Sequence, residues 1–376
     1  MKIGIDDRFL GTAGGFGRYT EELVKHLEKI DQSNDYLIFL TRQNFDLYQP
    51  ANPKFKKLLA NCRWYTLKEQ LVMPWKIWRA KLDLMHFVSW NVPLLNPAPF
   101  VVTIHDLILL KYPTQRASTL SPILYWLKNL TYRFTIKRAI KKARRIIAVS
   151  EFTKKDIIEN FKTAPEKIEV IYEGACPAGL GAVLAPANNQ VLQKYGVKKP
   201  YLLYVGVAYP HKNLEFLIDA FRLFVKQQPA YQLVLVGENN YFYQRLKQST
   251  PDQNVIFTGR LPDEELSAFY SQASLYLFPS LYEGFGLPAL EAMTRGLPVL
   301  ASNNSCLPEI LGRAALYFDP HNQTELIELI KRVLADASLQ NQLRAAGFEQ
   351  IKKYSWTDLA QNTLQVYNGE EVRTKN

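Results

Sequence analysis

Two glutamates with a fixed spacing could hold a polar ligand near the end of a strand. Glu283 and Glu291 are the first and last residues of the segment EGFGLPALE. The apolar run before it, residues 275–278, has the length of a strand, and Pro288 suits the start of a helix because no hydrogen bond is lost there. The two glycines allow the backbone to approach a ligand closely. The segment predicts a strand–loop–helix unit, with Glu291 in the first helical turn and both carboxylates at the edge where open α/β sheets bind ligands.

These two residues also fit a plainer interpretation. Glu291 would then only complement the helix dipole, and Glu283 would be a solvated acid in a loop.

A candidate anion site lies in the segment VGVAYPHKNL, which follows an apolar run at residues 201–205. Lys212 lies in the predicted strand-to-helix turn, and Asn213 is suited to cap the helix. A lysine is a compact positive charge that suits a diphosphate, and a helix N-terminus adds amide donors. His211 adds charge only when it is protonated. The alternative is a solvated lysine in a surface turn, which would contribute little to stability.

A histidine closes the predicted strand FVVTIHDL. His105 follows five apolar residues, which places it at the carboxyl end of a parallel strand. A histidine satisfied within the core and a histidine that contacts a ligand both fit this position.

The glycine-rich turn LGTAGGFGRYTEEL joins the first predicted strand to the first helix. It does not contain G-x-G-x-x-G, and the second strand ends in Thr41 and Arg42 without an acid for a ribose hydroxyl, which disfavours an oxidoreductase. Backbone amides near Gly14 and Gly15 can still receive a phosphate or a sugar hydroxyl. A plain tight turn is the alternative.

Strand-like and helix-like patterns alternate along the chain, which predicts the α/β class with parallel sheets. The expected strands are residues 2–5, 36–41, 84–88, 100–104, 145–150, 168–172, 201–205, 232–236, 255–258, 275–278 and 297–301. The expected helices are residues 19–30, 121–142, 151–161, 214–227 and 263–273, with a further helical pattern from Trp356 to Tyr367. A Gly-, Ala- and Pro-rich stretch from residue 174 to 200 indicates a linker. We expect two domains, 1–180 and 181–355, followed by a helix and tail at 356–376.

The positive charge is confined to the first half of the chain. Residues 1–185 hold 28 Lys and Arg against 17 Asp and Glu, while residues 186–376 hold 18 of each kind. The densest cluster is KRAIKKARR, residues 137–145. No nucleic-acid module is visible, so nucleic acid is not expected as a partner. A solvated basic face and peripheral contact with an anionic membrane both remain open.

The remaining composition indicates a globular protein without a metal or cofactor. The 376 residues are 47% hydrophobic, and the start lacks the apolar region of a signal peptide. The three cysteines are far apart and fit a reducing compartment. We therefore expect a cytoplasmic protein, peripheral on the inner face of the membrane if the basic half binds lipid. No His, Cys or Asp constellation has metal-ligand spacing.

Several of these motifs together resemble the retaining nucleotide-sugar glycosyltransferases of family 4. The Glu-x7-Glu spacing, the GG-x-G-R-Y opening and the HD-L pair are similar to that family. The resemblance implies the GT-B fold: two facing Rossmann-like domains with a cleft between them, and a C-terminal helix that crosses back to the first domain. The family often has Arg before Lys212, where this chain has His211, and some members have Arg where this chain has Val207.

The resemblance implies sugar transfer from a nucleotide-diphosphate donor to a hydroxyl of a glycan or lipid-linked acceptor. It implies catalytic roles for His105, Glu283 and Lys212. The donor-binding residues that it implies are Gly14, Gly15, His211, Lys212, Glu283, Gly284, Phe285, Gly286, Leu287 and Glu291. The overall similarity favours mannosyltransferases of surface polysaccharide assembly, hence GDP-mannose, with UDP-sugars as the alternative. Another GT-B activity, such as an epimerase or phosphorylase, and a non-catalytic nucleotide-sugar-binding subunit are the rival functions.

Overall fold

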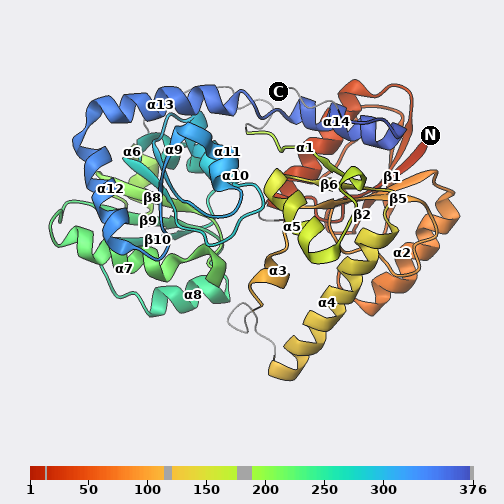
Figure 1. The fold of residues 1–376 in the computed structure, drawn as a ribbon, viewed down its shortest axis with the longest axis horizontal. Helices are drawn as coiled ribbons and strands as arrows, with labels where there is room; N and C mark the ends of the chain where they lie inside the picture. Colours follow the sequence, from red (N-terminus) through yellow and green to blue (C-terminus); the bar gives the residue numbers. More distant parts are fainter. Residues whose placement is uncertain (13–14, 114–120, 176–188, 373–376) are drawn as a thin grey trace. The chain divides into compact units, whose positions relative to one another are not determined.

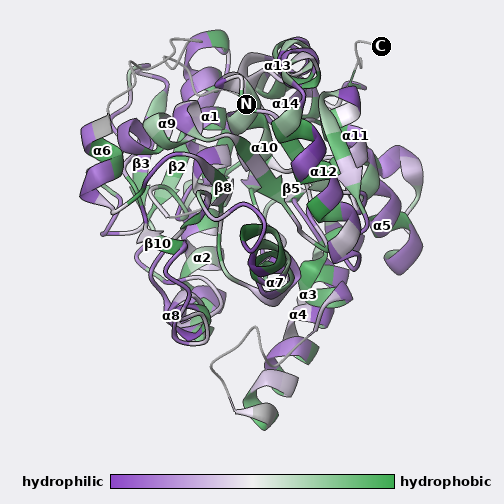
Figure 2. Ribbon diagram, turned by 90° about the vertical axis from the view of Figure 1, so that its left-hand side faces the viewer, coloured by the Kyte–Doolittle hydropathy of each residue, from purple (hydrophilic) through white to green (hydrophobic). Residues whose placement is uncertain are grey.

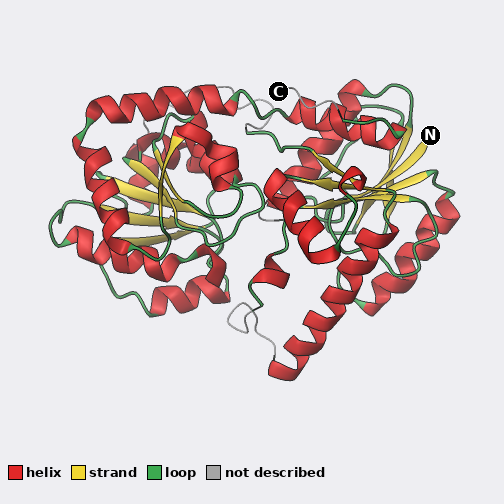
Figure 3. Cartoon of the chain, in the orientation of Figure 1, coloured by secondary structure: helices red, strands yellow, loops and turns green. Residues whose placement is uncertain are grey.

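The chain forms two compact units in the computed structural model, which describes residues 1–12, 15–113, 121–175 and 189–372. The described residues up to 174 and from 355 onwards form the first unit, and residues 175 and 189–354 belong to the second. Each unit is a parallel sheet with helices on both faces (Figures 1 and 3).

The first unit is built on a seven-stranded parallel sheet in the order β3-β2-β1-β4-β5-β6-β7. Its strands are β1 (Lys2–Asp6), β2 (Asp35–Leu40), β3 (Phe55–Leu59), β4 (Leu84–Phe87), β5 (Phe100–Ile104), β6 (Arg145–Ala148) and β7 (Ile168–Val170). Its helices are α1 (Gly15–Ile30), α2 (Leu67–Ala80), α3 (Ile108–Lys111), α4 (Pro122–Lys142), α5 (Glu151–Phe161) and α14 (Trp356–Asn368).

Connection handedness assigns these helices to the two faces of the sheet. The β1–α1–β2 connection runs towards one edge, whereas the connections through α2, α4 and α5 run towards the other, so right-handed crossovers put α1 opposite to α2, α4 and α5. The packing agrees, because α14 lies against α1, and Ile77, Ile136 and Ile157 of the other three helices share one apolar core. The expected return of the C-terminal helix to the first unit is therefore confirmed.

The second unit repeats this plan with six parallel strands in the order β10-β9-β8-β11-β12-β13. Its strands are β8 (Tyr201–Val205), β9 (Gln232–Val236), β10 (Val255–Gly259), β11 (Leu275–Phe278), β12 (Val299–Ser302) and β13 (Ala315–Phe318). Its helices are α6 (Asn189–Lys194), α7 (Leu214–Val225), α8 (Tyr241–Gln248), α9 (Asp263–Gln272), α10 (Leu287–Thr294), α11 (Leu307–Leu311), α12 (Gln323–Ala335) and α13 (Ala337–Ile351). The strand order reverses between β8 and β11, where sheets of this type bind ligands.

The predicted α/β class and parallel sheets are confirmed, but some elements had no sequence-based assignment. The edge strand β3 contains two lysines, which weaken a strand pattern. Helix α2 contains Pro74, a residue that normally ends a helix. Helix α1 begins four residues before the expected start at Tyr19, at Gly15. Most other boundaries differ by one or two residues.

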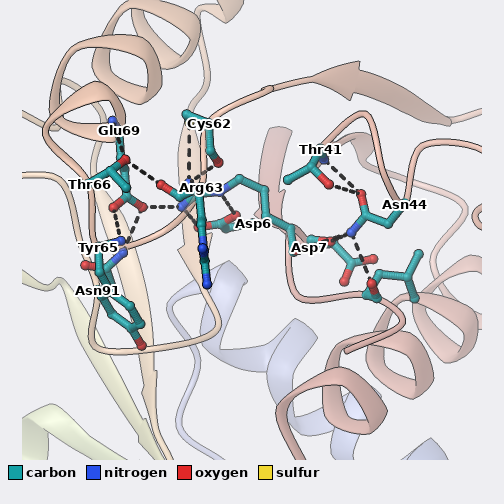
Figure 4. A network of polar contacts seen from close by, with 12 residues as sticks. Asp6, Asp7, Thr41, Asn44, Cys62, Arg63, Tyr65, Thr66, Glu69 and Asn91 are labelled. Carbon is teal, nitrogen blue, oxygen red and sulfur yellow. Dashed lines mark hydrogen bonds and ion pairs between the residues drawn. The ribbon is translucent and has the colours of Figure 1, made fainter. Parts of the chain in front are cut away.

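A buried ion network holds the end of β1 to helix α2 in the first unit (Figure 4). Arg8 makes two hydrogen bonds of 2.7 Å to Asp6 and one of 2.6 Å to Glu69 of α2, and all three side chains are buried. Glu69 also accepts from the Asn91 amide at 2.7 Å. Because each charge has an opposite partner, the cost of burying it is offset. Asp6 therefore has a structural partner within the fold.

The neighbouring Asp7 has no such partner. It is 1% exposed, and neither carboxyl oxygen has a hydrogen-bond partner among the described residues. The Thr20 hydroxyl donates to the Gly17 carbonyl instead. The Asn44 amide donates to the Asp7 carbonyl, so only the main chain is held (Figure 4). Burial raises the pKa of Asp7 to about 8.

The raised pKa of Asp7 predicts that the folded protein loses stability as pH rises, and that Asp7→Asn removes this loss. Between the unfolded value of 3.8 and about 8, the folded protein keeps a proton that the unfolded chain has released, so stability falls as pH rises through this window. The slope is about 1.4 kcal/mol per pH unit at most. We expect Asp7→Asn to melt at a higher temperature than the wild type at pH 8, with a smaller difference at pH 5. Asp46→Asn, at an exposed site, is the control. Equal pH profiles for wild type and Asp7→Asn would contradict an ionisable buried Asp7.

Candidate functional site

Two loops that leave neighbouring strands at the switch point form the core of the site in the second unit. Lys212 lies in the connection after β8, and Glu283 lies in the connection after β11. Because β8 and β11 are parallel neighbours, both connections begin at the same edge of the sheet. Residues 71 positions apart in the sequence are thereby brought together.

Lys212 and Glu283 form a nearly buried ion pair. The Lys212 ammonium lies 2.6 Å from Oε1 and 2.8 Å from Oε2 of Glu283. Their side chains are 15% and 9% exposed. The alternatives of a solvated lysine in a surface turn and of a solvated loop glutamate are therefore both excluded. A charge pair this far out of water is stable only while both members are present.

Further hydrogen bonds fix the two loops to each other and to the next connection. The Leu281 amide donates to the His211 carbonyl at 2.7 Å, which joins the Glu283 loop to the Lys212 turn. The Glu283 amide donates to the Ser305 hydroxyl at 3.0 Å, and the Cys306 thiol donates to the Phe285 carbonyl at 3.3 Å. The carboxylate is thus held by its backbone as well as by its partner.

Backbone conformation explains the glycine before helix α10. Gly286 has a φ of +105°, which side chains other than glycine rarely adopt. A Cβ there would also lie 3.0 Å from a Leu307 methyl group. Helix α10 then begins at Leu287, with Pro288 in its first turn. The glycine therefore allows the loop carrying Glu283 to turn directly into the helix carrying Glu291.

Glu291 lies in the second turn of α10, not in the first turn as expected from the sequence. The helix begins at Leu287, so the carboxylate is beyond the amides that have no helical partner. The Tyr270 hydroxyl of α9 donates to Glu291 Oε2 at 3.1 Å. A role in complementing the helix dipole is correspondingly weaker, since that effect falls off after the first turn.

His211 does not add charge to the Lys212 turn near neutral pH. Burial, followed by the charge of Lys212, lowers the pKa of His211 to about 3. Asn213 was expected to cap α7, but its side chain donates to the Pro320 carbonyl at 2.9 Å and makes no cap hydrogen bond. The residue instead has a left-handed backbone, with φ of +59°, which turns the chain into the helix.

His105 lies in the first unit, immediately after β5, and both of its ring nitrogens have partners. Nδ1 lies 3.0 Å from Glu173 Oε1, and Nε2 lies 3.0 Å from the Val88 carbonyl. The rings of Phe16 and Tyr19 contact the imidazole edge-on, each at 4.7 Å between centroids. Two polar partners and two neighbouring rings therefore hold the imidazole in place.

Sequence analysis did not identify Glu173 as a partner of His105. It follows β7 at the same edge of the sheet as His105, which is the one signal that could have indicated it. Of the two candidate glycines in the turn before α1, Gly15 is the first residue of that helix, while Gly14 lies outside the described residues.

Neither a metal-ligand cluster nor a helix able to cross a bilayer is present among the described residues. Residues 1–12, 15–113, 121–175 and 189–372 contain no cluster of three or more His, Cys, Asp or Glu that could hold a metal ion. Within the same ranges, no helix has both the length and the apolar character needed to cross a bilayer.

The buried ion pair predicts that Lys212 contributes to folding. Lys212→Met leaves Glu283 buried without its partner, and we expect the free energy of unfolding to fall by about 3 kcal/mol. Adding Glu283→Gln should restore part of the loss, which urea titration followed by circular dichroism would measure in a double-mutant cycle. The control is Lys194→Met. The Lys194 ammonium lies 2.7 Å from Oε1 of Glu265, a similar distance, but the Lys194 side chain is exposed. Similar small effects at both lysines would refute the buried pair.

Two glycosyltransferase family models match this chain. Residues 189–350 match the family model "Glycosyl transferases group 1", and residues 13–177 match "Glycosyltransferase Family 4". O-antigen chain mannosyltransferase B of Escherichia coli is 30% identical, with 94% of this chain and 95% of that protein covered.

Solved structures share the fold over 98% of the chain. Sucrose-phosphate synthase from Thermosynechococcus elongatus matches with a TM-score of 0.76 at 21% identity, covering 98% of each chain. Anabaena HepE in complex with UDP-glucose matches with a TM-score of 0.75 at 20% identity, covering 98% of this chain and 100% of that chain. The resemblance seen in the motifs is confirmed: the chain belongs to glycosyltransferase family 4 and is a glycosyltransferase of the GT-B fold.

Proposed function

We propose that this enzyme transfers mannose from GDP-mannose, with retention at the sugar carbon, to a hydroxyl of a glycan or lipid-linked acceptor. The C1–O bond to the β-phosphate breaks, a bond from C1 to the acceptor oxygen forms, and the acceptor proton is released. The relative from Escherichia coli, which is named as an O-antigen mannosyltransferase, supports the sugar. The observation that carries the proposal is the pair of Lys212 and Glu283 at the switch point of the second sheet.

The proposed donor site uses the two loops and helix α10. Lys212 would bind the diphosphate and stabilise the charge that develops on it as it leaves. Glu291 would accept hydrogen bonds from the ribose hydroxyls. Backbone amides of the segment 284–287, comprising Gly284, Phe285, Gly286 and Leu287, would assist at the phosphates and the sugar. His211, being neutral near pH 7, would contribute hydrogen bonding and packing and no charge.

The ion pair would allow the site to bind an anion without leaving Lys212 or Glu283 buried and without a partner. When a diphosphate becomes the partner of Lys212, the carboxylate of Glu283 is released to accept hydrogen bonds from hydroxyls of the donor sugar. Each buried charge then keeps a partner in both states, which limits the cost of binding. The same exchange would place Glu283 next to the reacting sugar.

We assign His105 to the donor sugar as well, on the side of the first unit. Glu173 and the Val88 carbonyl fix the plane of the imidazole, so a third contact would have to come from an edge or a face of the ring. We also propose that the backbone amides of Gly14 and Gly15 donate hydrogen bonds to the nucleotide-sugar donor. A lipid-linked acceptor would place the enzyme at the anionic inner face of the membrane.

A panel of nucleotide sugars tests the function directly. Purified enzyme, incubated with GDP-mannose, GDP-fucose, UDP-glucose or UDP-galactose and with glycan or lipid-linked acceptors, should release the most nucleotide diphosphate from GDP-mannose. Release from a UDP-sugar alone would overturn the choice of donor. Tight nucleotide binding without release from any sugar and acceptor would favour a non-catalytic binding subunit.

The two glutamates should separate binding from transfer. We expect Glu291→Ala to weaken the affinity for GDP about tenfold or more, because ribose contacts are present before and during transfer. Glu283→Gln should leave GDP affinity unchanged or raise it, because it removes the carboxylate that competes with the diphosphate for Lys212. It should slow transfer by roughly 10²–10³-fold, the scale for one charge-stabilising group. Isothermal titration calorimetry and single-turnover kinetics measure the two effects. Unchanged GDP affinity in Glu291→Ala would remove Glu291 from the ribose site.

A further inference from the structure

Exposed apolar side chains gather on two helices of the first unit. Ten large apolar side chains of α2 and α4 are between 44% and 87% exposed: Leu67, Leu71, Trp75, Trp78, Ile123, Leu124, Trp126, Leu127, Leu130 and Phe134. Single exposed apolar residues are ordinary, whereas a contiguous patch marks an interaction surface.

On α2 the exposed residues form a stripe. Leu67, Leu71, Trp75 and Trp78 are separated by four, four and three residues, so they share one side of the helix. The opposite side enters the core of the unit through Met73. The exposed stripe is therefore additional to the apolar face that folding requires.

Helix α4 carries a second stripe that changes from apolar to basic along its length. Exposed residues three or four apart follow one side of the helix: Ile123, Leu127, Leu130, Phe134, Lys137 and Lys141. Tyr132 and Ile136 on the opposite side are buried in the core. The first half of α4 extends away from the body of its unit in both ribbon views, and Figure 2 shows apolar and polar residues mixed along it.

The connection between β4 and β5 contacts both helices. The Gln70 side chain of α2 accepts from the Leu94 amide at 2.8 Å, and Arg138 of α4 donates to the Leu94 carbonyl at 2.9 Å. The next residue, Leu95, is itself exposed. We refer to the exposed sides of α2 and α4 together with Leu95 as the α2–α4 surface.

The charge of this surface is positive. Helix α4 contains six Lys and Arg and no Asp or Glu, and all six are exposed. The one acid of α2, Glu69, is buried against Arg8 and contributes no exposed negative charge. The Lys76 ammonium and the Arg79 guanidinium lie 5.3 and 5.4 Å from the Trp75 ring centre, so two cations lie next to this exposed aromatic ring.

We propose that the α2–α4 surface docks on an anionic lipid bilayer and inserts its two apolar stripes among the lipids. Apolar and aromatic residues flanked by Lys and Arg on one helix face are typical of helices that lie in the membrane interface. Tryptophan side chains favour that depth, and long basic side chains reach from it to the headgroups. A second copy of the chain fits this surface poorly, because a two-fold contact would set like charges against each other.

The exposed apolar side chains change the kind of membrane contact that the sequence predicted. The cluster KRAIKKARR predicted contact through charge alone, which salt would abolish. The structure adds an apolar component that salt does not screen, so part of the binding should persist at high salt. Membrane docking would bring the enzyme to a lipid-linked acceptor, so this proposal rests on the proposed function. Vesicle binding is measured without donor or acceptor, and a protein that fails to bind vesicles could still transfer sugar from its donor.

Co-sedimentation of the full chain with vesicles tests the proposal. The probes are phosphatidylcholine vesicles with and without 30% phosphatidylglycerol, as a suggested composition, at low and high salt. Leu127→Ser with Leu130→Ser and Phe134→Ser should weaken binding by about 100-fold or more, because each buried apolar side chain contributes substantially. Lys137→Gln with Lys141→Gln should weaken it about tenfold and reduce the dependence on salt.

Matched controls lie at exposed positions away from this surface. Leu47→Ser and Leu223→Ser remove exposed apolar side chains, and Lys226→Gln with Lys247→Gln removes the same charge as the paired lysine variant. We expect all of them to bind as the wild type does. Wild-type binding by the triple serine variant would overturn insertion, and a dimer that this variant abolishes would assign the surface to a second copy.

Tryptophan fluorescence provides a readout of depth. Lipids brominated on the acyl chains should quench the emission of Trp75, Trp78 and Trp126, and changing these three residues to Phe should remove most of the quenching. Trp356, which is buried, should remain unquenched. Absence of quenching in a protein that co-sediments would mean surface contact without insertion and would overturn the proposal.

Discussion

A lysine and a glutamate that are both largely removed from water are stable only as a pair, and the loops of the second unit are arranged around that requirement. Lys212 and Glu283 come from the connections that follow β8 and β11, the two strands at which the sheet order reverses. The hydrogen bond from the Leu281 amide to the His211 carbonyl joins those two connections, and the bond from the Glu283 amide to Ser305 joins the second one to the connection after β12. In a low-dielectric setting the lysine attracts any competing anion strongly, so the pair that stabilises the loops also prepares them for a diphosphate.

The first unit follows the same rule at its own sheet edge. Arg8 joins carboxylates from β1 and α2, and His105 joins Glu173 to the main chain after β4. Side chains at these strand ends are therefore positioned by charge partners from other elements. Asp7 departs from the rule, since burial raises its pKa and the folded chain keeps it neutral over most of the physiological range. A neutral acid can donate as well as accept a hydrogen bond, unlike the paired carboxylates around it.

The sequence predicts the parts of this protein that have local signatures. Alternating apolar runs and turns located most strands of both sheets, and the segment EGFGLPALE located the loop and helix of the site. Contacts between distant residues have no such signature: nothing near Lys212 indicates that Glu283 is its partner, or that His105 meets Glu173. The prediction that Asn213 caps helix α7 was wrong, because its side chain donates to the Pro320 carbonyl, 107 residues away in the sequence, instead. Helix α2 escaped assignment because Pro74 interrupts its pattern, although packing against the core sustains the helix.

Helix α4 shows why composition alone does not assign a surface. Its apolar residues lie on both sides of the helix, a pattern that fits a helix buried all round or one that contacts lipid. Burial distinguishes the two cases: Ile136 and its neighbours are in the core, whereas the stripe from Ile123 to Phe134 is exposed. The basic residues then occupy the end of the exposed stripe and not the core side, which is the order needed to hold apolar groups at an anionic interface. Charge and apolar area thus act at the same face, and neither accounts for the arrangement without the other.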